Sequence, residues 1–360
     1  MVRPRQISPL TGIGRSFNIR HRMVMPTRFS IMVTGALPMK DYVPLAQQVE
    51  AYGFDQMHIA DDLVFRPAWP ILTMIAMNTS RLQLGPFIVT PQVANPVYHA
   101  ANLAALDELS GGRMVCGVGR GGFNPLLGIT NPVKPVKMLK EAWLLMSRML
   151  QGGREPFDGE FFKATADLYF QFDVARTIPL FIGTWGPQMA KMAGSIAPGI
   201  KIDCTASPDH IAELRRQFIA GAEAAGRDTG NIEIIAGPLA SIDEDRAAAE
   251  DNIRGMLALL QPFLAPMTFA AGITQEEIDA SYNAFTAGEV EKAKALVTDK
   301  AVKAFSLTGT PGDVIGQIEA MIAGGADHIA FGPPLGPDPA GSLRLIGEKI
   351  LPHFRKLRDR

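Results

Sequence analysis

Short apolar segments alternate with longer segments of helical periodicity along most of the chain, a pattern typical of parallel strands covered by helices. Residues 82–90 are largely apolar, as expected for a strand that is buried on both faces. Asn95 and Pro96 then supply a helix N-cap and a first-turn proline, and the helical spacing of apolar residues ends at Gly111. A second apolar segment, residues 114–118, follows. This stretch is therefore predicted to be a strand-helix-strand unit.

The same alternation predicts eight strands in all. They are expected at residues 29–34, 57–60, 82–90, 114–118, 179–182, 200–204, 232–235 and 328–331. Helices are expected between successive strands, with start signals at Ser207-Pro208, at Asp243 and at the Thr310 to Asp313 capping box. Eight buried parallel strands fit either a closed barrel or an open doubly wound sheet.

Two segments depart from the alternation. Residues 152–177 are aromatic, contain proline and are irregular, and we expect them to be an insertion that covers one end of a barrel. Residues 262–300 lack strand signals and are expected to form short helices, as a second insertion. Because single barrels commonly reach 360 residues, we expect one domain over residues 29–360.

Composition narrows the classes of function. The formal net charge is −1, so a general nucleic-acid-binding surface is not expected. No stretch approaches the roughly 20 apolar residues that cross a bilayer, and we expect a soluble, cytoplasmic protein. The two cysteines, Cys116 and Cys204, fall in predicted buried strands and are expected to be reduced apolar fillers. The sequence contains no recognisable cluster of metal ligands.

The first 28 residues differ from the rest of the chain. They contain six arginines, no acidic residue and no apolar core pattern. We expect a flexible basic arm. An organellar targeting segment and an arm that packs on a partner subunit are the alternatives.

A glycine-rich run, Gly117 to Gly122, follows the fourth predicted strand and satisfies the spacing G-x-G-x-x-G. A dinucleotide-binding fingerprint requires a helix to open at once, and Asn124-Pro125 interrupts it, so we reject that interpretation. Gly121 and Gly122 instead offer backbone N–H groups where a cofactor can approach closely, with Arg120 as a partner for an anionic tail. An ordinary glycine-rich turn is the alternative.

Two further candidate sites lie at predicted strand ends. The loop from Gly183 ends at Pro187, the first residue of a helix, so Thr184, Trp185 and Gly186 are expected to offer unpaired N–H groups where the helix macrodipole favours an anion. Asp61 and Asp62 end the second strand and are candidates to bind a cofactor hydroxyl or to transfer a proton. A plain strand-to-helix turn and a solvated turn are the respective alternatives.

Four motifs together resemble the luciferase-like superfamily of flavin and deazaflavin barrels, and within it the methylene-tetrahydromethanopterin reductases. The motifs are LGPFIVTP, ALDELSGGR with its GVG continuation, FIGTWGP and FGPPLGPD. The resemblance implies a TIM (β/α)8 barrel whose site lies at the carboxyl ends of the strands. It also implies an oxidoreductase of one-carbon metabolism that transfers hydride between coenzyme F420 and a pterin-bound one-carbon unit. A homodimer is expected from it, with the apolar helices around residues 96–150 as a candidate interface.

The resemblance assigns roles to particular residues. It implies a non-proline cis peptide between Phe87 and Ile88 that backs the deazaflavin ring, and it identifies the loop from Thr184 to Pro187 with a phosphate loop. It matches Asp62 to an aspartate of the relatives, which makes Asp62 the candidate catalytic residue. Asp61, Arg120, Gly121 and Gly122 are expected to line the cofactor site.

Three departures from the family pattern are evident. Leu63 replaces a histidine, Met32 replaces a glutamate thought to act in proton transfer, and Gly122 replaces an acid. Two other hypotheses therefore stay open: an FMN-dependent monooxygenase of the luciferase type, and a non-catalytic relative that binds a cofactor. Hydrolysis by a serine nucleophile is unsupported, because no serine lies in a G-x-S-x-G motif.

Overall fold

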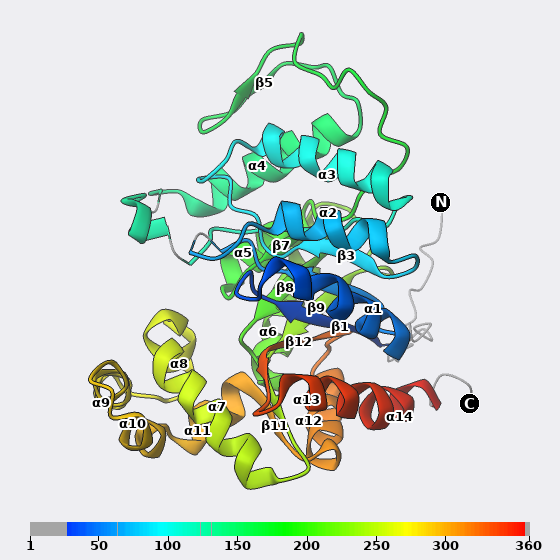
Figure 1. The fold of residues 1–360 in the computed structure, drawn as a ribbon. Helices are drawn as coiled ribbons and strands as arrows, with labels where there is room; N and C mark the ends of the chain where they lie inside the picture. Colours follow the sequence, from blue (N-terminus) through cyan, green and yellow to red (C-terminus); the bar gives the residue numbers. More distant parts are fainter. Residues whose placement is uncertain (1–26, 63, 123, 131, 357–360) are drawn as a thin grey trace, which may run out of the picture.

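Eight parallel strands form a ring with helices around the outside (Figure 1). The structure is a computed structural model, and it describes residues 27–62, 64–122, 124–130 and 132–356. The basic arm expected over residues 1–28 lies almost entirely outside the described residues. Of the two arrangements that the sequence pattern allowed, the closed (β/α)8 barrel is confirmed.

Each strand of the ring coincides with a predicted segment. In hydrogen-bonded order the strands are β3 (Gln83–Pro86), β2 (Gln56–Ile59), β1 (Arg28–Val33), β12 (His328–Leu335), β9 (Glu233–Gly237), β8 (Gly199–Asp203), β7 (Leu180–Gly183) and β4 (Cys116–Val118). Parallel bridges that pair Leu84 with Met114 and Val89 with Val118 join β3 to β4 and close the ring. The barrel therefore has no exposed edge within these eight strands.

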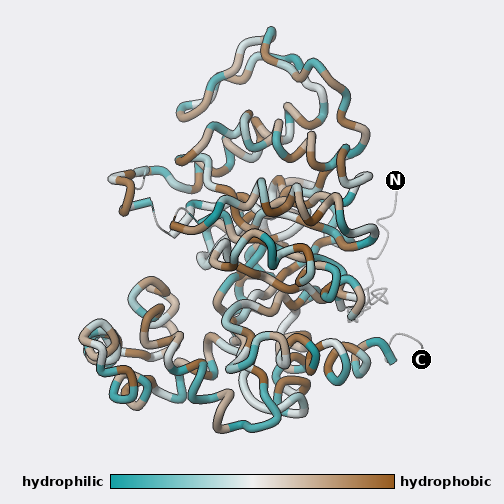
Figure 2. Tube along the Cα trace, viewed as in Figure 1, coloured by the Kyte–Doolittle hydropathy of each residue, from teal (hydrophilic) through white to brown (hydrophobic). Residues whose placement is uncertain are grey.

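Amphipathic helices cover the outside of the ring. They are α1 (Tyr42–Tyr52), α2 (Ala68–Asn78), α3 (Pro96–Ser110), α4 (Pro135–Leu150), α5 (Pro187–Gly194), α6 (Pro208–Ala224), α12 (Pro311–Ala323), α13 (Pro339–Leu345) and α14 (Leu351–Lys356), with a π-helical turn at Ile346–Ile350 and 3-10 turns at Met39–Asp41 and Asn124–Leu127. A further helix, α7 (Arg246–Leu260), lies against strands outside this ring. Figure 2 shows hydrophobic and hydrophilic residues alternating along them. The predicted caps are present: Asn95 accepts a hydrogen bond from the Val97 N–H at 2.9 Å, and Gly111 ends α3 with φ 70°.

Two strands, β10 (Leu239–Ile242) and β11 (Ser306–Gly309), were not predicted from the sequence. They pair with each other, and β10 also pairs with the carboxyl part of β12, so they extend the sheet beyond the ring. Because β10 occupies the residues before Asp243, the helix expected from Asp243 begins at Arg246, with Asp245 as its cap. β10 follows β9 after the single residue Pro238, and β11 directly follows α11 (Asp299–Phe305), so no turn residues mark where either strand begins.

The second insertion forms short helices, as predicted. They are a 3-10 turn at Gln261–Leu264, α8 (Met267–Ala270), α9 (Gln275–Thr286), α10 (Val290–Leu296) and α11 (Asp299–Phe305). Together with α7 they enclose a separate group of buried apolar side chains, and we call α7 to α11 the helical subdomain. Figure 1 shows α8 to α11 projecting to one side of the barrel.

The first insertion does not cover a barrel end, contrary to the prediction. Its short hairpin, β5 (Phe157–Asp158) and β6 (Lys163–Ala164), lies beyond the outer face of α4 (Figure 1). Glu141 of α4 accepts hydrogen bonds from the N–H groups of Glu160 at 3.1 Å and Phe161 at 2.7 Å. Arg176 binds Asp107 of α3 at 2.6 Å. The segment is thus anchored to the outer helices α3 and α4.

Among the described residues, no helix combines the length and the apolar character that a membrane span requires. The same residues contain no group of three or more side chains suited to hold a metal ion.

Helices α5 and α6 approach each other unusually closely, and two glycines permit this. A Cβ added to Gly194 would lie 1.9 Å from the Phe218 carbonyl oxygen, and one added to Gly221 would lie 1.8 Å from the Lys191 carbonyl oxygen. Both clashes are with backbone, which cannot rotate away. The position of α5, and of the loop that leads into it, therefore depends on these glycines.

We expect Gly221→Ala to lower the free energy of unfolding by at least about 2 kcal/mol, because α5 and α6 must move apart. Gly316→Ala is the matched control, since Gly316 lies on the exposed face of α12 with open space where a Cβ would point. That control should gain about 0.5–1 kcal/mol from better helix propensity. Urea unfolding followed by circular dichroism measures both, and equal stability of the two variants would contradict this account of the packing.

Candidate functional site

The amino-terminal half of the barrel interior holds a buried polar network. Arg28 donates to both carboxylate oxygens of Glu233 at 3.2 Å, and His328 Nδ1 lies 2.7 Å from the same carboxylate. His58 is fully buried, and its Nε2 lies 2.7 Å from the Gln56 side chain. Burial holds the pKa of His58 well below its usual range, with the nearby Lys201 cation adding to the effect, so His58 is neutral.

An apolar layer separates this network from the carboxyl ends of the strands. It consists of Phe87, Val115, Phe181, Ile235 and Ala330, each contributed by a different strand or strand end. The Phe87 ring also stacks on His58, with 3.9 Å between ring centroids. Phe87 is therefore part of the barrel core, with 1% of its surface exposed.

Above the apolar layer, one lysine reaches across the barrel. Lys201 of β8 has no exposed surface, and its Nζ lies 2.9 Å from Met32 Sδ of β1. Since β1 and β8 are not neighbours in the ring, this contact crosses the interior. Lys201 Nζ also lies 3.1 Å from Asp203 Oδ1 and 4.9 Å from the centroid of the Phe87 ring. Lys201 and Asp203 thus form an ion pair just below the rim.

Asp62 lies close enough to this ion pair to be affected by it. Burial and, to a smaller extent, the negative charges of Asp203 and Asp61 raise the pKa of Asp62 against the opposing effect of Lys201, and together these effects bring it to about 6. Burial also raises the pKa of Asp203 and lowers that of Lys201, although the ion pair opposes both shifts. Asp62 is thus an acid whose protonation changes close to neutral pH, a property suited to proton transfer.

The wall next to Asp203 is formed by Trp185 and Cys204. Trp185 Nε1 donates to the Asp203 carbonyl oxygen at 2.8 Å, and both Trp185 and Cys204 pack against the apolar core of the helical subdomain. Cys204 adopts φ 50°, and burial raises its pKa to about 12, so it remains a thiol rather than a nucleophilic thiolate. The subdomain therefore borders the site through these two residues.

The peptide bond between Phe87 and Ile88 is cis, as the family resemblance implied. Three glycines of the neighbouring strands surround it. A Cβ on Gly117 would lie 2.5 Å from the Phe87 ring, and a Cβ on Gly119 or Gly183 would lie within 3 Å of the Ile88 side chain. Glycine is therefore required on β4 and β7 to make room for residues 87 and 88.

The residues predicted at the glycine run differ in backbone conformation and in their contacts. Gly121 adopts φ 76°, and Gly122 has open space where a Cβ would point. Arg120 is exposed, and its carbonyl oxygen accepts hydrogen bonds from Thr90 Oγ1 at 2.9 Å and from the Asn124 amide at 2.7 Å. The run is thus anchored by its backbone, while Gly122 and Arg120 are exposed.

One prediction about polar groups needs correction. The Thr184 N–H donates to the Lys201 carbonyl oxygen at 2.9 Å, and the Gly186 N–H donates to Thr184 Oγ1 at 3.0 Å, so these two N–H groups are paired, contrary to the prediction. The Asp61 carboxylate accepts a hydrogen bond from the Ala68 N–H at 2.9 Å, at the start of α2. Its role in a cofactor site stays a prediction. Pro187 does begin α5, as predicted.

Sequence reasoning missed Lys201 and Asp203. A signal was present, because β8 reads Gly-Ile-Lys-Ile-Asp, and a strand places its alternate residues on one face. In a strand whose other face is apolar, two charged residues two positions apart indicate an ion pair inside the barrel. Their partner Met32, on a distant strand, carried no such signal.

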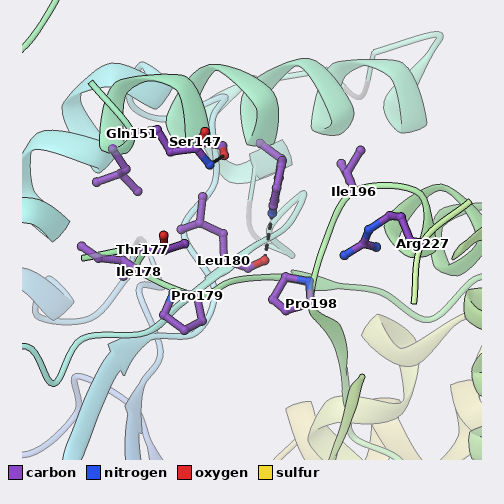
Figure 3. A pocket seen from close by; sticks show the side chains of 11 residues that line it. Ser147, Gln151, Thr177, Ile178, Pro179, Leu180, Ile196, Pro198 and Arg227 are labelled. Carbon is purple, nitrogen blue, oxygen red and sulfur yellow. Dashed lines mark hydrogen bonds between the residues drawn. The ribbon is translucent and has the colours of Figure 1, made fainter. Parts of the chain in front are cut away.

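A cavity of about 260 Å³ lies at the opposite end of the barrel (Figure 3). Its walls include Pro179 and Pro198, which precede β7 and β8, and Arg227, which follows α6. The Trp143 indole, which also lines the cavity, donates to the Leu180 carbonyl oxygen at 2.8 Å. This cavity is separate from the residues around Lys201.

Comparisons with known proteins show the family and support the fold. Residues 19–328 match the model of a family described as luciferase-like monooxygenase. The chain is 32% identical over 322 residues to 5,10-methylenetetrahydromethanopterin reductase of Archaeoglobus fulgidus, which covers 87% of the chain and 95% of that relative. It is 29% identical over 341 residues to an F420-dependent glucose-6-phosphate dehydrogenase of Rhodococcus jostii, covering 88% of the chain and 95% of that relative.

Superposition on solved structures supports the same fold. The coenzyme F420-dependent tetrahydromethanopterin reductase of Methanopyrus kandleri superposes with a TM-score of 0.85 at 27% identity, covering 91% of this chain and 99% of that one. An F420-dependent secondary alcohol dehydrogenase superposes with a TM-score of 0.75 at 21% identity, covering 91% of this chain and 98% of the other, and supports the fold alone.

We expect Asp62→Asn to stabilise the protein more at pH 7.5 than at pH 4.5. The folded-state pKa of about 6 lies above the ordinary value of 3.8, so wild-type stability falls as pH rises between these values, and the penalty persists above pH 6. Removing the carboxyl should therefore add about 1–2 kcal/mol more to the free energy of unfolding at pH 7.5 than at pH 4.5. Urea unfolding at the two pH values measures this, and a benefit that does not grow with pH would refute it.

Proposed function

The chain belongs to the luciferase-like monooxygenase family, and we propose that it uses coenzyme F420 to transfer hydride to or from a pterin-bound one-carbon unit. Its class is that of the F420- or flavin-dependent oxidoreductases. The proposal of F420 and a pterin-bound substrate rests on the similarity to methylenetetrahydromethanopterin reductases over nearly the whole chain, in sequence and in fold.

The residues at the rim are compatible with a tricyclic coenzyme. Gly122 and Gly186 have open space where a side chain would point, so a flat ring system or its tail can approach the backbone there. Ile88, next to the cis peptide, is half-buried and offers an apolar surface. We assign the coenzyme to the space bounded by Ile88, the Gly121-Gly122 turn and the loop from Thr184 to Pro187.

When bound, the coenzyme supplies the hydride chemistry, and the protein supplies orientation and proton control. Ile88 supports one face of the ring, with Phe87 fixed beneath it by His58. Arg120 serves as a counter-charge for the anionic tail. Asp62 holds or releases a proton at the rim, and Asp61 keeps it in place by anchoring the start of α2.

An FMN-dependent monooxygenase is the second candidate, because the family model carries the name of luciferase-like monooxygenases. Titration of the purified chain with F420 and with FMN separates the two. We expect F420 to show a changed absorbance and fluorescence on binding, with FMN unaffected, and turnover with a methylene-tetrahydropterin. Binding of FMN alone, with oxygen consumption on reduction, would replace the proposal by the monooxygenase.

We expect Gly186→Leu to weaken F420 binding at least about tenfold, because the side chain would enter space assigned to the coenzyme. Stability should change little, since nothing lies within 4 Å of the added Cβ and φ at this residue is −119°. Gly316→Leu on α12 is the control and should bind F420 like the wild type. Equal affinity of both variants in the same fluorescence titration would place the coenzyme elsewhere.

A further inference from the structure

The two carboxylate oxygens of Asp203 have different surroundings. Oδ1 is buried and lies 3.1 Å from Lys201 Nζ. The Asp203 side chain keeps 22% of its surface exposed, and because Oδ1 is buried, the accessible oxygen is Oδ2. Among the described residues, no group donates a hydrogen bond to Oδ2. This oxygen can therefore accept hydrogen bonds from a ligand at the end of β8.

The protein holds this carboxylate in one position. Lys201 has no exposed surface, and its ammonium group favours the ionised form of the Asp203 carboxyl. A Cβ added to Gly237 of β9 would lie 2.4 Å from Asp203 Oδ1, so glycine at this position leaves room for the carboxylate. The Cys204 N–H donates to the Gly237 carbonyl oxygen at 2.6 Å, which joins β8 to β9 at this level.

The neighbours of the ion pair at the rim carry no charge of their own. The half-buried Trp185 indole donates to the Asp203 carbonyl oxygen at 2.8 Å. The half-buried Met32 lies on the far side, with its Sδ 2.9 Å from Lys201 Nζ. Because Trp185 belongs to the loop assigned to the coenzyme, Asp203 lies beside that space. One anionic acceptor between apolar side chains is typical of a group that orients a small ligand.

The chemistry of a carboxylate oxygen restricts what Asp203 can recognise. An ionised carboxylate only accepts hydrogen bonds, and each oxygen has two lone pairs. Its complement is a pair of parallel N–H donors, such as the N3–H and 2-amino groups on one edge of a pterin. In flavins and deazaflavins the corresponding edge places N3–H between two carbonyl oxygens, and these oxygens repel a carboxylate. Asp203 can therefore distinguish the two ring systems that the proposed reaction brings together.

We propose that Asp203 is the specificity-determining residue for the pterin ring, and that its Oδ2 accepts hydrogen bonds from the N3–H and 2-amino groups. Lys201 and Gly237 fix the position of this carboxylate. The inference rests on the proposed function for its substrate class and deepens it, because it assigns the pterin to the side of the rim formed by Asp203 and Trp185. It concerns an edge that all 2-amino-4-oxopteridines share.

The test compares 6-methylpterin with 6-methyllumazine, in which a carbonyl oxygen replaces the 2-amino group. Isothermal titration calorimetry measures both affinities on the full chain, with and without saturating F420. We expect 6-methylpterin to bind at least about tenfold more tightly, because the lumazine lacks one donor and places an oxygen against the carboxylate. In Asp203→Asn this preference should vanish or reverse, since the amide N–H matches the lumazine carbonyl.

Two further variants make the assignment specific. Asp209→Asn, at an exposed position in the first turn of α6, is the matched control and should keep the preference. The double variant Lys201→Met/Asp203→Asn removes the buried cation together with its partner, so it tests the same loss without leaving an unpaired charge. It should bind the two probes with similar affinity.

Three results would overturn the inference: equal affinity of the wild type for the two probes, binding of neither probe, or a preference that both Asp203 variants retain. Loss of the preference in Asp62→Asn alone would assign the recognition to Asp62 instead. The proposed function fails separately. If F420 does not bind and the preference for 6-methylpterin remains, the coenzyme assignment is wrong and the role of Asp203 stands.

Discussion

A side chain that points into a closed ring of parallel strands cannot reach bulk water, so every charge placed there needs a partner within the ring. This chain meets the constraint with two polar layers and an apolar layer between them. Arg28, Glu233 and His328 balance one another at the amino-terminal end, and Lys201 and Asp203 do so at the carboxyl end. The charges of each polar layer are therefore balanced within that layer.

Much of the fold follows from the sequence, because strands buried on both faces are apolar and their helices carry local start and stop signals. The eight ring strands, the cap at Asn95 and the short helices of the second insertion all have such signals. The strands β10 and β11 do not, because β10 follows β9 after one residue and β11 directly follows α11, so no turn signal marks their beginning. The placement of residues 152–177 also escaped prediction, since it depends on Glu141 and on other side chains of the outer helices.

The sequence predicted only those parts of the site that depend on residues close to one another along the chain. Asp62 could be predicted as a site residue because it directly follows a predicted strand. The cis peptide between Phe87 and Ile88 was predicted from the family resemblance, not from composition. The Lys201 contacts join strands that are far apart in the ring, and no spacing along the chain encodes them. The N–H groups of Thr184 and Gly186 were misjudged for a related reason, since their acceptors come from tertiary contacts and from a loop side chain.

The strands that flank the helical subdomain pair with each other, from Leu239 with Ser306 to Ile242 with Gly309. The subdomain is therefore a crossover unit in its own right, attached to the barrel mainly where β10 meets β12. Its helices border the rim through Trp185 and Cys204 but contribute no strand to the ring. Replacing α8 to α11, or changing their length, would consequently alter the wall at Trp185 and Cys204 without disrupting the ring of strands. The helical subdomain is therefore the part of the fold in which substrate preference can change most easily.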